Sequence, residues 1–163
     1  MRFLLTFYAI KVIIYNEYLY KNKGDTCMNR RQARENVFYL VFETEFQKND
    51  INCAELFQTA QDIGVVEYDE YTEHVFFGVM NELDNIDTKI SDCSKGWRLD
   101  RISKVSLAIM RICVYEMLYC EDIPFNISIN EAVELAKKFD FDKAPSFING
   151  VLNKIAENEG LKY

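Results

Sequence analysis

The sequence predicts an all-α protein. Apolar residues recur at intervals of three and four along most of the chain, which is the spacing of one face of a helix. No stretch of useful length alternates apolar and polar residues, as a half-buried strand would. Two helix-start signals, Asn29-Arg30-Arg31-Gln32 and Ser128-Ile129-Asn130-Glu131, precede apolar-periodic segments. With 49% apolar and 28% charged residues, the 163-residue chain can bury a core.

The N-terminal half predicts a lobe of three helices over about residues 28–95. The first helix covers residues 30–46, where apolar positions follow helical spacing, and a polar run at 48–50 ends it. A short second helix ends near Gly64. A third apolar stripe covers residues 71–86, again at intervals of three and four.

The second predicted lobe covers about residues 96–163. Residues 97–119 form either one long helix or a short helix followed by a longer one. Between 105 and 118 the segment is apolar nearly all round, which is typical of a central buried helix. Arg111 and Glu116 interrupt this segment, and we expect both to find polar partners inside the protein.

Two further helices complete the second lobe. Residues 123–126, Ile-Pro-Phe-Asn, predict a loop because the residue before a proline avoids the helical region. The capping box at residues 128–131 predicts a helix that starts there and runs to about Phe139. Pro145 starts the last helix, since proline is favoured in a first turn. The total is about six to seven helices in two packed lobes.

We expect the first 27 residues to be a leader whose translation is doubtful, and not a part of the fold. They are rich in apolar and aromatic residues, but Lys11 and Glu17 interrupt the run. The run is too short to span a bilayer, and no small-x-small cleavage site follows it. We expect the translation start to be Met28, the folded domain to cover residues 28–163, and the protein to have no membrane association.

Charge and cysteine content limit the possible functions. The net charge is −7, and the first 27 residues carry four basic and two acidic side chains, so the remainder nets −9. So acidic a body excludes a general nucleic-acid coat and requires any RNA site to be local or shared with a basic partner. The cysteines at 27, 53, 93, 113 and 120 form no C-x-x-C pair, and one histidine cannot complete a zinc set with them. We expect reduced, mostly buried thiols, a cytoplasmic location and no metal.

No pattern indicates an active site or a cofactor. The glycines stand singly, so there is no glycine-rich phosphate loop. His74 is the only histidine, and the sequence places no oriented nucleophile or carboxylate with it. We expect a partly buried, hydrogen-bonded His74, and we expect the protein not to be an enzyme.

Basic residues at the start of the first helix are the strongest candidate for a binding site. Arg30, Arg31, Gln32 and Arg34 lie where the helix macrodipole favours negative charge, so the arginines oppose it. A polyanion would remove that conflict by meeting arginine forks and free backbone N–H groups together. The alternative is a solvated surface with no ligand.

Five motifs in series resemble the NusB family of bacterial transcription antitermination factors. The resemblance covers residues 28 to about 157. The motifs, in chain order, are Arg30-Arg31-Gln32-Ala33-Arg34-Glu35, Ile109-Met110-Arg111-Ile112-Cys113-Val114-Tyr115-Glu116, Ile123-Pro124, Ile129-Asn130-Glu131-Ala132-Val133-Glu134-Leu135-Ala136-Lys137 and Phe147-Ile148-Asn149-Gly150-Val151-Leu152.

The resemblance implies a fold of two packed helical lobes and a role in transcription. NusB-like proteins pair with the small-subunit ribosomal protein NusE. The pair binds boxA RNA, which is single-stranded, and holds RNA polymerase, with other Nus factors, in a termination-resistant state on ribosomal RNA operons. An acidic body with one basic segment suits a subunit whose basic partner supplies further positive charge.

The resemblance also implies the RNA-contacting residues. Arg30, Arg31 and Arg34 would contact phosphates or base edges, and Gln32 a base or sugar. The loop from Asp122 to Asn126 would complete the RNA surface.

Two departures from the family pattern should weaken RNA affinity for the lone protein. Gln32 stands where many relatives have arginine, and Phe125-Asn126 stands where relatives often have Tyr-Lys. Phe125 can still stack on a base, or it can pack on the core.

The predicted partner surface is the start of the second lobe, near Arg98, Arg101 and Lys104. A competing hypothesis is a helical interaction module, a homodimer or ribosome-assembly factor, without sequence-specific RNA binding. A third is an enzyme, because NusB-like domains occur fused to RNA methyltransferases, but the sequence has no glycine-rich loop for a cofactor.

Overall fold

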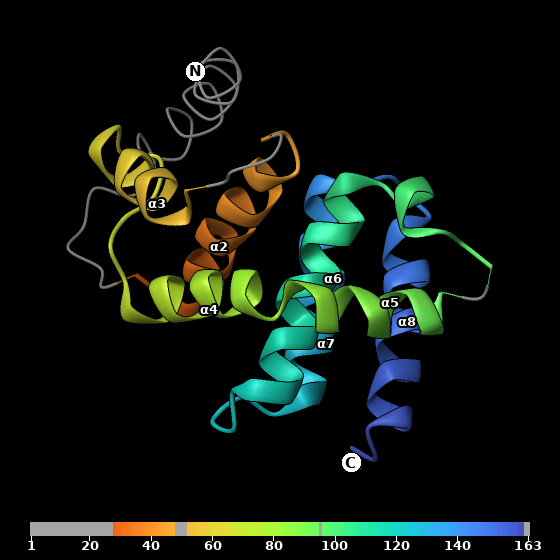
Figure 1. Cartoon of the computed structure of the whole chain (residues 1–163). Helices are drawn as coiled ribbons and strands as arrows, with labels where there is room; N and C mark the ends of the chain where they lie inside the picture. The colour runs from red at the N-terminus through yellow and green to blue at the C-terminus, as the bar shows by residue number, and fades with distance from the viewer. Residues whose placement is uncertain (1–27, 48–51, 95, 162–163) are drawn as a thin grey trace.

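The computed structural model of the chain describes residues 28–47, 52–94 and 96–161. Those residues form helices and no strand, which confirms the all-α prediction of six to seven helices (Figure 1). The leader prediction for residues 1–27 lies outside them. The elements are α2 (Arg30–Thr44), α3 (Cys53–Asp62), α4 (Glu70–Asn81), α5 (Leu83–Cys93), the 3-10 turn η1 (Leu99–Arg101), α6 (Lys104–Tyr119), α7 (Phe125–Phe139) and α8 (Ala144–Asn158).

Helix α6 is the central helix of the fold. Every residue from Ser106 to Met117 is buried, which confirms the expectation of a helix covered on all sides. It contacts α2, α4, α5, α7 and α8. Figure 1 shows α2, α3 and α4 gathered together, and α6, α7 and α8 packed side by side. Residues 97–119 are therefore a short helix followed by a longer one, as one of the two sequence alternatives had it.

The two charged residues inside α6 have polar side-chain partners, as predicted. Both side chains are almost fully buried. Arg111 donates to both carboxylate oxygens of Asp87, each at 2.7 Å, and pairs with Glu45. Glu116 accepts a hydrogen bond from the Arg34 guanidinium at 2.8 Å. Pairing offsets the desolvation that would make either charge costly alone.

The third predicted stripe is two helices, not one. The chain bends at Glu82, which ends α4 and begins α5 with φ −101° and ψ 14°. Helix α4 packs on α2 and α6, whereas α5 packs on α6 and α8. One straight helix cannot keep its apolar stripe against both sets of neighbours. The predicted lobe boundary near residue 95 stays a prediction.

Helix α7 begins three residues before the predicted start. Pro124 is its N-cap, and the amides of Ile127 and Ser128 donate to the Pro124 carbonyl at 2.9 and 3.2 Å. Residues 125 and 126, predicted as loop, are thus helical, because proline fixes a φ that suits a helix start. Ser128 is buried and caps nothing. Pro145 does lie in the first turn of α8, as predicted.

The described cysteines are free thiols. Cys93, Cys113 and Cys120 are buried and Cys53 is partly buried, while Cys27 lies outside the described residues. Burial raises the pKa of the Cys113 thiol, which keeps it protonated and inert. No helix in the described ranges is long and apolar enough to cross a membrane.

Candidate nucleic-acid interface

The start of α2 is fixed by a reciprocal capping box. The Asn29 side chain accepts from the Gln32 amide at 3.0 Å, and the Gln32 side-chain carbonyl accepts from the Asn29 amide at 3.1 Å. This arrangement satisfies donors that a helix start leaves open. Gln32 therefore holds the helix start in place, and its role as an RNA contact stays a prediction.

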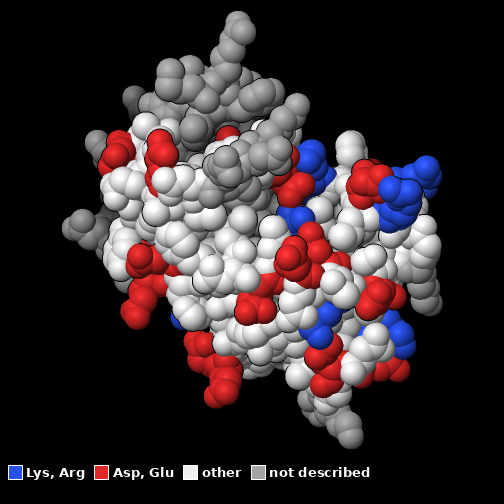
Figure 2. Space-filling view, in the orientation of Figure 1, with Lys and Arg blue, Asp and Glu red and all other residues white. Residues whose placement is uncertain are grey.

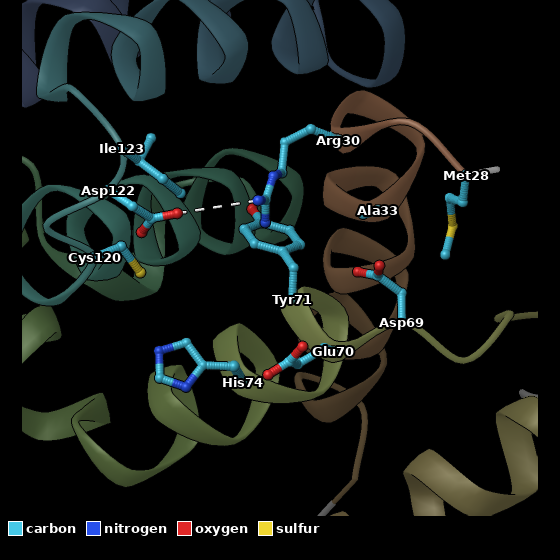
Figure 3. Close-up of a pocket in the computed structure, with 10 residues that line it drawn as sticks. All are labelled: Met28, Arg30, Ala33, Asp69, Glu70, Tyr71, His74, Cys120, Asp122 and Ile123. Atoms are coloured by element: carbon cyan, nitrogen blue, oxygen red, sulfur yellow. Dashed lines mark ion pairs between the residues drawn. The ribbon is translucent and has the colours of Figure 1, made fainter.

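Arg30 is stacked over an aromatic ring. Its guanidinium carbon lies 4.4 Å from the centre of the Tyr71 ring, a cation–π distance. A guanidinium nitrogen lies 4.0 Å from the Asp122 carboxylate, and half of the Arg30 side chain is exposed. Figure 3 shows the Arg30 side chain reaching from α2 toward Tyr71 and the loop after α6.

Arg31 points to α7 instead. Its Nε and Nη2 atoms donate to the two oxygens of Glu131 at 3.2 and 3.0 Å. These hydrogen bonds lower the pKa of Glu131 and raise the pKa of Arg31. The Arg31 side chain is still 61% exposed, so an anionic ligand can reach it.

Arg34 differs from the prediction. Its side chain is 6% exposed and is bonded to Glu116, with Glu131 at 3.7 Å. A guanidinium so enclosed cannot present its fork to RNA, and it stabilises the contact between the helices. Its position in the sequence carried a signal, since Arg34 stands three and four residues before Val37 and Phe38 of the buried stripe.

Tyr71 is the site residue that sequence reasoning missed. Its ring is buried, and its hydroxyl donates to the Glu116 carboxylate that also accepts from Arg34. Burial, followed by the Glu116 charge, raises the pKa of Tyr71, so its hydroxyl stays protonated. Nothing in the sequence signals that Tyr71 meets Arg30, because their pairing depends on how α4 packs on α2.

The predicted loop residues separate in the structure. Asp122 is exposed and lies by Arg30. Phe125 and Asn126 are half-buried in the first turn of α7, and Phe125 packs against the core. The core-packing alternative for Phe125 is therefore the one that the structure supports.

A pocket of about 680 Å³, here called the Arg30 pocket, opens where α2, α4 and the α6–α7 loop meet (Figure 3). Its lining includes Arg30, Tyr71, Asp122 and Ile123. His74 also lines it, and is exposed rather than partly buried as expected, with a ring nitrogen 3.5 Å from the Tyr115 hydroxyl. In the described parts of the chain no cluster of three or more metal-ligating side chains occurs.

The predicted partner residues lie at the opposite end of α6. Lys104 begins α6 and donates to the Glu45 backbone carbonyl and carboxylate at 3.0 and 3.1 Å. Arg98 pairs with Asp100 at 3.1 Å, and Arg101 is exposed. The 16 residues of α6 separate this end from the Asp122 end by roughly 22 Å, at about 1.5 Å per residue.

The visible face of the molecule is mainly acidic. Figure 2 shows carboxylates spread over both halves, with basic side chains mostly over the half that holds α5 and α8. A single-stranded nucleic acid would therefore find its positive contacts locally, as the net charge indicated.

The profile of the NusB family matches residues 31–157 of the chain. Two proteins named transcription antitermination protein NusB are similar in sequence. The one from Acetivibrio thermocellus is 44% identical over 131 residues, covering 80% of this chain and 90% of the relative. The one from Bacillus subtilis is 44% identical over 128 residues, covering 78% and 95%.

Solved structures agree on the fold. A structure of T. maritima NusB has a TM-score of 0.70 and 32% identity, covering 81% of this chain and 93% of that one. Another, of antitermination factors NusB and NusE in complex with dsRNA, has a TM-score of 0.70 at 23% identity, covering 79% and 96%. At 23% identity, the similarity to this second structure supports the fold alone.

Proposed function

The chain belongs to the NusB family of transcription antitermination proteins, and from that membership we propose how it acts on RNA. It binds a boxA-like single-stranded RNA together with ribosomal protein NusE. The complex joins RNA polymerase and other Nus factors and promotes read-through of ribosomal RNA operons. Family membership also supports a non-enzymatic factor, and a role in bacterial transcription supports a cytoplasmic location.

The observation that carries the proposal is the pair Arg30 and Arg31 at the exposed start of α2. Their side chains are 50% and 61% exposed, and they extend in two directions, toward the Asp122 loop and toward α7. RNA loops and single strands are bound through phosphates, base edges and stacked rings. Two accessible guanidinium groups offer a phosphate fork and a stacking plane within one turn of helix.

Internal pairing explains why a partner is needed. Asp122 and Glu131 already hold Arg30 and Arg31, so RNA phosphates must compete with carboxylates of the same protein. The lone protein then gains little net attraction from a polyanion. A basic partner such as NusE supplies the missing positive charge, and this chain supplies the shaped surface.

The test is fluorescence anisotropy of a labelled boxA-like RNA titrated with the full chain, alone and with NusE, against a scrambled RNA. We expect sequence-dependent binding that strengthens with NusE. With about three to five phosphate contacts, the slope of log affinity against log salt should lie between about −2 and −3.5. Equal affinity for both RNAs in both conditions contradicts the proposal.

The pairing of the arginines also favours the second candidate, an interaction module without sequence-specific RNA binding. Replacing Arg30 and Arg31 together by alanine separates the two. RNA binding collapses under the first proposal and is unchanged under the second. The matched control replaces Arg98 and Arg101 together by alanine. This double replacement removes the same charge at the other end of α6, and it should leave RNA binding measured without NusE nearly intact.

A further inference from the structure

The charge of the Arg30 pocket disfavours a phosphate as its occupant. Three carboxylate residues, Asp69, Glu70 and Asp122, line it against one guanidinium. A phosphate placed inside would meet net negative charge at short range. A neutral group that donates hydrogen bonds faces no such repulsion, and the volume of about 680 Å³ lies in the range of small-ligand sites.

The pocket contains a fixed flat surface. Arg30 lies over the Tyr71 ring at 4.4 Å, and Tyr71 is held from below by its bond to Glu116. Figure 3 shows the guanidinium between the tyrosine ring and the side of the pocket formed by Asp122 and Ile123. Guanidinium planes and aromatic rings are the surfaces on which proteins stack unpaired bases.

A hydrogen-bond acceptor stands at the edge of this plane. The Asp122 carboxylate lies 4.0 Å from the Arg30 guanidinium, and its side chain is 73% exposed. A carboxylate accepts hydrogen bonds and donates none, so it pairs with the amino group of a base and rejects a carbonyl. Ile123, next in the chain, adds an apolar wall to the same pocket.

We infer that the Arg30 pocket binds one nucleobase of the RNA, a base that carries an exocyclic amino group. The base stacks on the Arg30 guanidinium, and its amino group donates to Asp122. Guanine suits the site best, because its ring N–H and amino group lie side by side and match the two oxygens of a carboxylate. This inference rests on the proposed function, since it names what the RNA places at the start of α2.

A cationic side chain of a protein partner is the competing occupant. The carboxylates would attract it, but Arg30 stands inside the pocket and would repel it. The flat guanidinium over Tyr71 also gives a lysine nothing to stack on, whereas it matches the face of a base.

The experiment removes one amino group of the RNA at a time. In a boxA-like RNA, each guanosine is replaced by inosine, each adenosine by purine riboside and each cytidine by its 4-deamino analogue. Each RNA is titrated by anisotropy with the full chain and with Asp122→Ala, in the presence of NusE. We expect one position at which loss of the amino group weakens binding to the unaltered protein by about tenfold to 150-fold, the range of a single hydrogen bond to a charged group. Asp122→Ala should bind both RNAs equally at that position.

The readout is the ratio between the two RNAs, because removing a carboxylate raises the affinity for any polyanion. Glu121→Ala is the matched control, since it removes the same charge from an exposed neighbour outside the pocket lining. It should keep the discrimination. Arg30→Lys keeps the positive charge but lacks the plane, and should reduce both binding and discrimination.

Two results overturn the inference. One is that no position shows a discrimination that Asp122→Ala abolishes. The other is that Asp122→Ala leaves RNA discrimination unchanged but weakens capture of NusE, which assigns the pocket to a cationic side chain. Failure of the proposed function looks different, since the unmodified RNA and its scrambled control would then bind alike.

Discussion

Arg31 and Glu131, one hundred residues apart in the chain, form a two-point hydrogen bond between the first turn of α2 and α7. The carboxylate occupies the guanidinium fork as a phosphate would. The Glu131 carboxylate thus occupies the position that an RNA phosphate would take at one of the two exposed arginines at the start of α2.

Glu131→Gln should strengthen RNA binding. Loss of the carboxylate charge frees the Arg31 fork for one more phosphate, so the log–log salt slope should steepen by about 0.7, the single-strand value per contact. Anisotropy titrations between low and moderate salt measure both quantities. Glu134→Gln on the same helix is the matched control, because Glu134 pairs with Lys137 and should change the slope little. Unchanged or weaker binding by Glu131→Gln would contradict the competition between Glu131 and RNA.

Arg34→Met should destabilise the fold. It leaves the Glu116 carboxylate, whose side chain is 1% exposed, without its guanidinium partner. Breaking a buried pair from one side costs about 3–5 kcal/mol. The double variant Arg34→Met/Glu116→Gln should recover a large part of that loss, since it removes the unpaired charge and keeps an acceptor for Tyr71.

Urea unfolding at pH 7 measures these free energies. Arg98→Met, which breaks an exposed pair with Asp100, should stay within about 0.5 kcal/mol of the unaltered protein. A loss below about 1 kcal/mol for Arg34→Met would mean that the pair is not structural.

Protonation of Glu45 should lower the free energy of unfolding in acid. Burial alone would raise the pKa of this carboxyl, but hydrogen bonds from Arg111 and Lys104 outweigh it and lower the pKa below its ordinary value of 4.5. A lowered folded-state pKa gives stability that is present above the unfolded value and is lost as the pH falls through the folded value. Glu45→Gln should therefore flatten the loss of stability below about pH 4.5.

Glu43, two residues earlier in the chain, should have the opposite effect on the pH dependence of stability. Burial raises the pKa of Glu43 above its ordinary value, so its contribution grows as the pH falls and is lost as the pH rises through the folded pKa. Glu43→Gln should steepen the acid loss that Glu45→Gln flattens. Urea midpoints at pH 7, 5 and 3.5 for the two variants make the comparison, and parallel curves would refute the assignment.

Gly78→Ala should destabilise the contact of α4 with α6. A Cβ at Gly78 would lie 2.0 Å from the Tyr115 ring, which is stacked on Tyr119 at 5.0 Å between ring centres. Overpacking of this kind costs about 1–3 kcal/mol. Gly150→Ala in α8 is the control, because its Cβ meets nothing within 4 Å. There the gain in helix propensity should stabilise by about 0.5–1 kcal/mol, and thermal unfolding should show opposite shifts for the two variants.

Local sequence patterns determined the helices, since these depend on contacts within a few residues. The capping box at Asn29 and Gln32, the proline in the first turn of α8 and the all-round apolar run in α6 each appear in the structure as predicted. The bend at Glu82 and the early start of α7 were missed. Both are set by which neighbours a helix must pack against, and that information lies far away in the chain.

The sequence motifs determined the family, and with it the part of the chain where RNA binding was expected. Only the tertiary structure decided what each arginine of that segment does. Arg30 and Arg34, four residues apart, lie on the same side of α2, and both guanidinium groups approach Tyr71, at 4.4 and 5.8 Å. Arg34, one turn further into the helix, is enclosed, whereas the side chain of Arg30 is half exposed. Arg34 meets Glu116 across 82 residues, Arg31 meets Glu131, and Arg30 lies over Tyr71. No periodicity encodes such pairings, because they arise when separate helices pack together.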